Sequence, residues 1–106
     1  MLIRTIGAAL LVSCTVLAMQ PVSRRVVSSG PAPVGPYSPA IDAGGLIYLS
    51  GTMPQDDTAA VVAKGDVGAQ TGRVLERMRD LLGAAGTSLD QVVSVTVYLT
   101  IIDARE

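Results

Sequence analysis

The stretch "DVGAQTGRVLERMRDLLGAAG", residues 66–86, carries the clearest helical pattern in this chain. Its apolar side chains recur at intervals of three and four residues and therefore share one face of a helix. They are Val67, Val74, Leu75, Met78, Leu81, Leu82 and Ala85. Asp66 is a suitable N-cap, and Gly86 suits the left-handed position that follows a last helical turn. The stretch thus predicts a helix that lies with its apolar face on a core.

The charged residues of this helix lie largely off the apolar face. Spacings of three residues bring Arg73 next to Glu76 and Arg77 next to Asp80. Such side-chain pairs stabilise the exposed side of a helix. The spacing therefore favours a solvated face over the alternative interpretation of the arginines, an anion-binding site.

Two segments that flank the helix have the pattern of strands. Leu46–Ser50 follows a double-glycine turn and places Ile47 and Leu49 on one face. Val92–Thr100 alternates strictly, with valine and leucine on one face and hydroxyl and tyrosine side chains on the other. We expect a strand-helix-strand unit in which the apolar face of the second strand meets the helix. The polar face of that strand suits an oligomer whose sheets face one another.

Two loops are predicted from proline, glycine and aspartate. The stretch "GPAPVGPYSPAI", residues 30–41, holds four of the six prolines of the chain. Each proline fixes φ and removes a backbone donor, so this stretch is an extended, polyproline-like segment rather than a helix or a central strand. It is either a stiff linker or a rigid arm that holds Tyr37 against a ligand. The second loop covers residues 51–66 and includes one short edge strand at Val61–Ala63.

Composition excludes several classes of site. The chain of 106 residues has no histidine, one cysteine and a net charge of −1. A Ser-His-Asp site, a Cys-His site, a zinc site and a disulfide framework are therefore excluded. A net charge of −1 provides no basic surface of the kind that binds nucleic acid. We expect no metal and no cofactor.

The N-terminus has the layout of an export signal. Residues 1–19 combine a basic start at Arg4 with an apolar run that is shorter than the roughly 20 residues of a membrane span. "LVSC" resembles a lipobox, which would make Cys14 a lipidation site, whereas "VLA" (residues 16–18) suits ordinary signal peptidase. We expect export, to the periplasm or as a membrane-anchored lipoprotein, so that contact with the membrane is made only through the signal or its lipid. An uncleaved membrane anchor is the remaining alternative.

The rest of the chain divides into a spacer and one domain. Residues 20–30 are small or polar without periodicity and predict a spacer. Residues 31–106 predict a single domain of about three strands and one helix. So small a sheet buries a marginal core and leaves strand edges unpaired. We therefore expect a domain that is truncated at its C-terminus.

A family pattern runs through residues 31–106. "GPYSPAI", "AGGLIYLSGTMP", the helix of residues 66–86 and the strand "VVSVTVYLTIIDA" follow one another in an order that resembles the RidA (YjgF-type) family of reactive-intermediate deaminases. The resemblance implies an α+β, chorismate-mutase-like fold with a mixed sheet packed against helices. It also implies a homotrimer with ligand clefts between the subunits. The present chain would supply the N-terminal part of that domain.

The resemblance further implies an activity and part of a site. Family members hydrolyse reactive enamines and 2-imino acids to 2-oxo acids and ammonia without a cofactor, so a small carboxylate or imine metabolite is the expected ligand. Tyr37 matches the pocket tyrosine, and Gly51, with Ser50 beside it, matches the position whose backbone approaches the ligand. Pro39 stands where the family more often has glutamine. The family arginine and glutamate belong to a C-terminal region that is absent from this chain, so the catalytic residues stay unassigned.

Three hypotheses about function follow from these observations. The first is a deaminase of the 2-iminobutanoate or 2-iminopropanoate type. The second is a non-catalytic trimer that binds a small molecule in the same cleft, and the third is an inactive fragment. Fold alone does not choose among them.

Overall fold

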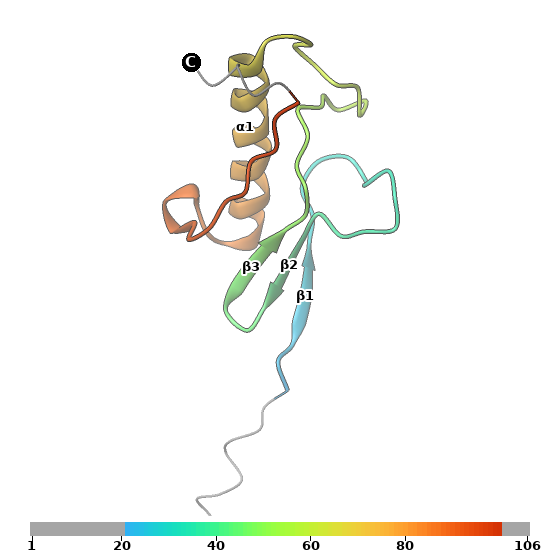
Figure 1. Cartoon of the computed structure of the whole chain (residues 1–106). Coiled ribbons are helices and arrows are strands. Elements are labelled where there is room, and N and C mark those ends of the chain that lie inside the picture. The colour runs from blue at the N-terminus through green and yellow to red at the C-terminus, as the bar shows by residue number, and fades with distance from the viewer. Residues whose placement is uncertain (1–20, 101–106) are drawn as a thin grey trace, which may run out of the picture.

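The computed structural model describes residues 21–100 of the chain. In this part an α+β arrangement forms, with three short strands, one long helix and a single 3₁₀ turn (Figure 1). In chain order these are β1 (Arg24–Val27), β2 (Ala40–Ala43), β3 (Leu46–Leu49), α1 (Val67–Ala85) and η1 (Leu89–Gln91). The α+β class predicted from the sequence is confirmed. The export signal of residues 1–19, with Cys14, lies outside the described residues and stays a prediction.

The strands form an antiparallel sheet in the order β1-β2-β3. Ala43 of β2 pairs with Leu46 of β3, so the hairpin loop consists of Gly44 and Gly45. Their φ angles are 62° and 83°, a left-handed conformation that suits a two-residue hairpin and that glycine adopts without steric cost. The double-glycine turn predicted from the sequence is confirmed.

Strand β1 corrects the prediction that residues 20–30 are a spacer. Residues 24–27 pair with β2, with Val27 opposite Ala40. The Arg25 guanidinium also donates to the Asp42 carboxylate across the two strands at 3.1 Å. Four residues are too few to show a periodicity. The strand forms because a partner distant in sequence satisfies its backbone groups, and its last residue, Val27, is buried at 2% exposure.

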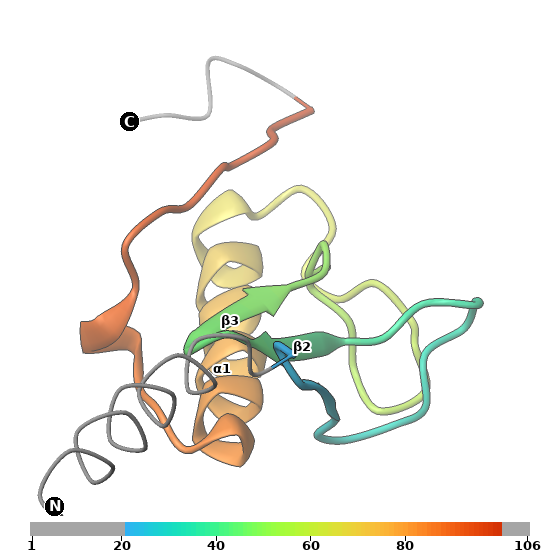
Figure 2. The same cartoon turned by 90° about the horizontal axis from the view of Figure 1, so that it is seen from below.

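Helix α1 lies across one face of the sheet, as the view from below shows (Figure 2). Among residues 21–100 the buried side chains are Val27, Ala40, Leu81 and Leu82. Two of them come from the sheet and two from the C-terminal half of α1, so the core lies where these elements meet. In β3, residues 47 and 49 are half-buried while residues 46 and 48 are exposed, which confirms the predicted faces of that strand.

Both ends of α1 are capped as the sequence predicts. The Asp66 carboxylate accepts a hydrogen bond from the Ala69 amide at 2.9 Å. At the other end Gly86 has a φ of 86°, and its amide and that of Thr87 donate to carbonyls of the last turn. The helix therefore begins and ends within one residue of its predicted limits.

The predicted strand Val92–Thr100 is wrong for this structure. The segment is assigned to no strand, and its side chains are largely exposed, with Val93 at 89% and Tyr98 at 91%. It leaves η1 as an irregular stretch (Figure 1). An alternating sequence makes a strand only where another edge supplies hydrogen bonds, and none of the strands between residues 21 and 100 pairs with it. Its valines consequently do not pack on α1.

Candidate functional site

A cavity of about 340 Å³ lies between the proline-rich loop, the segment that follows β3 and helix α1. The loop contributes residues 29–34, Tyr37 and Pro39. All three residues that the sequence singles out as ligand-binding, Tyr37, Ser50 and Gly51, line this one cavity. Tertiary structure thus places Tyr37 and the pair Ser50 and Gly51, which are well separated in sequence, around the same cavity.

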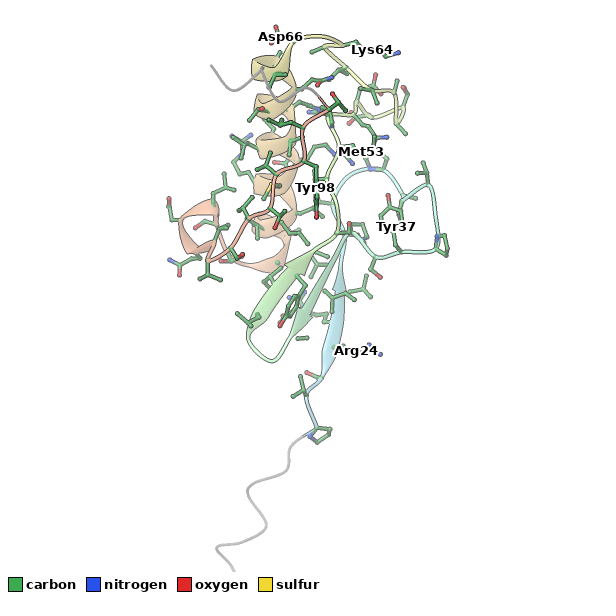
Figure 3. All side chains as sticks on the ribbon, viewed as in Figure 1. Arg24, Tyr37, Met53, Lys64, Asp66 and Tyr98 are labelled. Atoms are coloured by element: carbon green, nitrogen blue, oxygen red, sulfur yellow. The ribbon has the colours of Figure 1, made fainter. Side chains whose placement is uncertain are left out.

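The proline-rich loop is bent rather than extended. The Tyr37 amide donates to the Gly35 carbonyl at 2.8 Å, which closes a three-residue turn and corrects the predicted polyproline-like course. A Cβ built on Gly35 would lie 3.4 Å from two ring carbons of Tyr37. The tyrosine ring therefore packs over the glycine. Tyr37 is half-exposed and lies on the same side of the molecule as Met53 (Figure 3).

Ser50 joins two walls of the cavity. Its amide and its hydroxyl both donate to the Pro39 carbonyl, at 2.9 and 3.1 Å. Pro39 thus contributes only its backbone carbonyl to these two bonds, and any residue at this position would provide the same acceptor. Because the hydroxyl proton of Ser50 is used in this bond, its oxygen can serve a ligand only as an acceptor. Nothing lies within 4 Å of a Cβ built on Gly51, so the backbone there is open to a ligand.

Asp56 organises the loop on the far wall. Its Oδ1 accepts hydrogen bonds from the Thr58 hydroxyl at 2.7 Å, the Thr58 amide at 2.8 Å and the Ala60 amide at 3.1 Å. The Thr58 hydroxyl bond and then the two amide bonds hold the pKa of Asp56 below its ordinary value of 3.8. Asp56 is therefore a loop-forming carboxylate and not a proton donor at neutral pH. The strand predicted at residues 61–63 is not formed, and the structure has in its place a single antiparallel β-bridge between Gln55 and Val61.

Two arginines of α1 complete the wall, which corrects the prediction that they face solvent. Arg73 donates through Nε to the Gln55 carbonyl at 2.8 Å. It also pairs with Glu76 at 3.3 Å, as predicted, and with Asp57 at 3.5 Å. All three sides of its guanidinium are engaged.

Arg77 differs from Arg73 in its partners. Its Nη1 donates to the Met53 carbonyl and to Oε1 of Gln55, each at 3.0 Å. The predicted pair with Asp80 does not form among the described residues, and Asp80 lies 3.9 Å from Nε of Arg79. The contacts with residues 53 and 55 span more than twenty positions of sequence. No local spacing indicated them, and Arg77 was consequently missed as a cavity residue.

Within residues 21–100, no group of three or more histidine, cysteine, aspartate or glutamate side chains could hold a metal ion. Over the same residues, no helix combines the length and apolar character that a membrane span requires. The expectations of no metal and no cofactor stay predictions.

Known proteins resemble this chain over most of its length. Residues 27–105 match the family model described as Endoribonuclease L-PSP. A RutC family protein of Pyrococcus horikoshii is 46% identical over 71 residues, which are 67% of this chain and 56% of the relative. The 3-aminoacrylate deaminase RutC of Acinetobacter baylyi is 42% identical over 69 residues, which are 65% of this chain and 55% of that protein.

A solved structure agrees with these matches. The crystal structure of YyfA from Yersinia pestis, described as a protein of unknown function of the conserved Rid family, superposes with a TM-score of 0.62. The two sequences are 36% identical, and the match covers 67% of this chain and 58% of that one. The chain thus spans a little more than half the length of the relatives it matches.

Proposed function

The chain belongs to the RidA (YjgF-type) family, and from this premise we propose that it serves the hydrolytic deamination of reactive 2-imino and enamine acids. A 2-imino acid, or the 2-amino enamine that tautomerises to it, gives a 2-oxo acid and ammonia. The observation that carries the proposal is the 42% identity to a 3-aminoacrylate deaminase, because 3-aminoacrylate is itself an enamine acid. The matched region of this chain includes the residues that line the cavity.

The proposed hydrolysis needs few catalytic groups from the protein. An enamine acid gains a proton at carbon to become the imine, and a water molecule then adds to the imine carbon. In the resulting carbinolamine the amino nitrogen takes up a proton and leaves as ammonia while the hydroxyl gives up its proton, so that a 2-imino acid ends as the 2-oxo acid. Because the imine carbon is already electrophilic, orienting the substrate and one water molecule supplies most of the catalysis. In this proposal the Tyr37 hydroxyl, the Ser50 oxygen and the open Gly51 backbone orient the substrate.

The proposal includes an assembly in which the cleft is shared between subunits of a homotrimer. Exposed apolar side chains on the sheet support it. Leu46 is 51% exposed and Tyr48 is 58% exposed, and both lie on the face of β3 that is turned away from α1. Covering such an apolar face with a second subunit removes it from water and stabilises the assembly.

Ribonuclease activity, which the description of the family model names, is less well supported for this chain. Its net charge is −1 and its pI is about 5.2. Proteins that bind nucleic acid owe much of their affinity to an excess of lysine and arginine. The chain also lacks histidine, the commonest general acid and base near neutral pH.

Ammonia release from 2-iminobutanoate, generated in situ by oxidation of the parent amino acid, tests the proposal. We expect the full chain to accelerate release over buffer. Tyr37→Phe should slow it about threefold to tenfold, the worth of one hydrogen bond, with an unchanged melting temperature. No acceleration over buffer would contradict the deaminase proposal. If 2-oxobutanoate still binds in that case, the non-catalytic binding protein is the better description.

A further inference from the structure

Residues 53–62, which we call the strap, form one internally bonded unit and supply one wall of the cavity. The Asp56 amide donates to the Ala60 carbonyl at 3.0 Å, and the Val62 amide donates to the Pro54 carbonyl at 2.8 Å. Oδ1 of Asp56 accepts three further hydrogen bonds from within the strap. These bonds join the strap to itself, so they stay intact when it moves as one body.

Three side chains of α1 tether the strap, and their spacing of three and four residues places them on one face of the helix. Gln70 donates through Nε2 to the Val62 carbonyl at 3.1 Å. Arg73 and Arg77 both bind Gln55, at 2.8 Å to its carbonyl and at 3.0 Å to its side chain. Among the described residues, all hydrogen bonds between the strap and α1 come from these three side chains.

Apolar packing contributes little to holding the strap in place. No residue of 51–66 is buried. The strap is also strained at Ala59, whose φ of 66° brings Cβ close to the backbone. Helix α1, by contrast, buries Leu81 and Leu82. Because water can replace the polar tethers but not the buried contacts, the strap detaches at a lower free energy than α1 unfolds.

A glycine stands just outside each end of the strap. Gly51 precedes it, and a Cβ built there has no atom within 4 Å. Gly65 follows it with a φ of 84° and has equally open surroundings. Hinges are typically a few loop residues that absorb changes in φ and ψ, and glycine does so at little steric cost. The strap therefore has a suitable hinge on either side.

We propose that the strap is a lid on the cavity, which Gln70, Arg73 and Arg77 of α1 hold closed. The lid opens as one body while α1 stays folded, and its opening widens the cavity. Arg73 and Arg77 are positioning residues in this device, because they fix the wall that the strap provides. Admission of the imine substrate by this route rests on the proposed function, whereas the opening itself does not.

Hydrogen exchange of the Arg73 Nε–H, followed by nitrogen-15 NMR of the full chain, measures the opening. This proton is bound to the Gln55 carbonyl only while the lid is closed. The Nε–H of Arg79 serves as an internal reference, since its ion pair with Asp80 spans 3.9 Å, too long for a hydrogen bond. We expect the Arg73 proton to be more protected than that of Arg79 and less protected than the backbone amide of Leu81.

Variants of the other two tethers test whether the lid opens as one body. Gln70→Ala removes one neutral hydrogen bond and should speed exchange of the Arg73 Nε–H about threefold. Arg77→Gln removes two bonds from a charged donor and should speed it about tenfold. The backbone amides of α1 should exchange as before in both variants. Arg79→Gln is the matched control, because Arg79 donates to no group of the strap among the described residues, and it should leave the Arg73 proton unaffected.

Unchanged exchange of the Arg73 Nε–H in either folded variant would overturn the proposal, because the tethers would then open independently. Protection equal to that of the Leu81 amide would overturn it too, since the strap would open only when α1 unfolds. Protection no greater than that of Arg79 would show that α1 does not hold the lid closed. If Arg77→Gln fails to fold, Gln70→Ala decides the question. The measurement needs no ligand, so a lack of ammonia release contradicts only the deaminase.

Discussion

Two glycines near the C-terminal end of α1 should respond to alanine in opposite directions. Gly83 lies inside the helix, whereas Gly86 follows it with a φ of 86°. A Cβ built on either glycine has no atom within 4 Å beyond the local backbone. Packing therefore contributes almost nothing to the difference, and the backbone conformation of each residue decides the sign.

The magnitudes follow from the two conformations. Gly83→Ala should raise the free energy of unfolding by about 0.5–1 kcal/mol, because alanine loses less backbone entropy in a helix. Gly86→Ala should lower it by about 1–2 kcal/mol, since a Cβ is strained at this left-handed position. The variants should thus differ by about 2 kcal/mol. At a urea slope of about 1 kcal/mol per M for a small domain, their midpoints should lie about 2 M apart.

Urea unfolding followed by the helical circular dichroism of both variants measures this difference. The protein concentration is kept equal, because any self-association shifts the midpoint with concentration. If both substitutions move the midpoint in the same direction, the C-terminal boundary of α1 does not lie between these two residues. If Gly86→Ala leaves the midpoint unchanged, the left-handed turn after the helix is absent in solution.

Three further predictions concern the loop before α1 and its first turn. Asp66→Ala should lower stability by about 1 kcal/mol, as loss of an N-cap does, measured by urea unfolding, and an unchanged midpoint would contradict the cap. Ala63→Gly should raise the free energy of unfolding by about 0.5 kcal/mol, because Ala63 has a φ of 48°, a left-handed conformation that glycine adopts without strain. The thermal midpoint should rise accordingly, and a lower midpoint would argue against that conformation. Asp56→Asn should destabilise the protein at neutral pH and lose this effect in acid. The depressed pKa of Asp56 means that its ionised form stabilises the loop above pH 3.8, and that this stabilisation disappears as the pH falls through the lower native value. A pH-independent difference between the two proteins would refute the role of the charge.

Local features could be predicted because each depends on neighbouring residues. The limits of α1 follow from Asp66, Gly86 and the apolar spacing between them. The hairpin follows from Gly44 and Gly45, whose positive φ angles few other residues adopt. The ligand-binding candidates were chosen by family resemblance, and the structure places them around one cavity.

Features that depend on distant partners could not be predicted. Strand β1 exists because β2 pairs with it, and its four residues carry no pattern of their own. Val92–Thr100 shows the reverse case, since its strict alternation finds no edge to pair with among residues 21–100. Arg77 was expected to pair along the helix with Asp80 and instead donates to residues 53 and 55.

The sequence by itself determined the helix, its caps and the hairpin, because their energies come from backbone conformation and from contacts a few residues apart. It also carried the family pattern on which the proposed deamination rests. Tertiary structure alone decided where the cavity lies and that Arg73 and Arg77 of α1 line it. Those features depend on which loops pack against α1. That packing is decided by long-range hydrogen bonds and buried surface set against the entropy of ordering the loops, and no local spacing in the sequence reveals it.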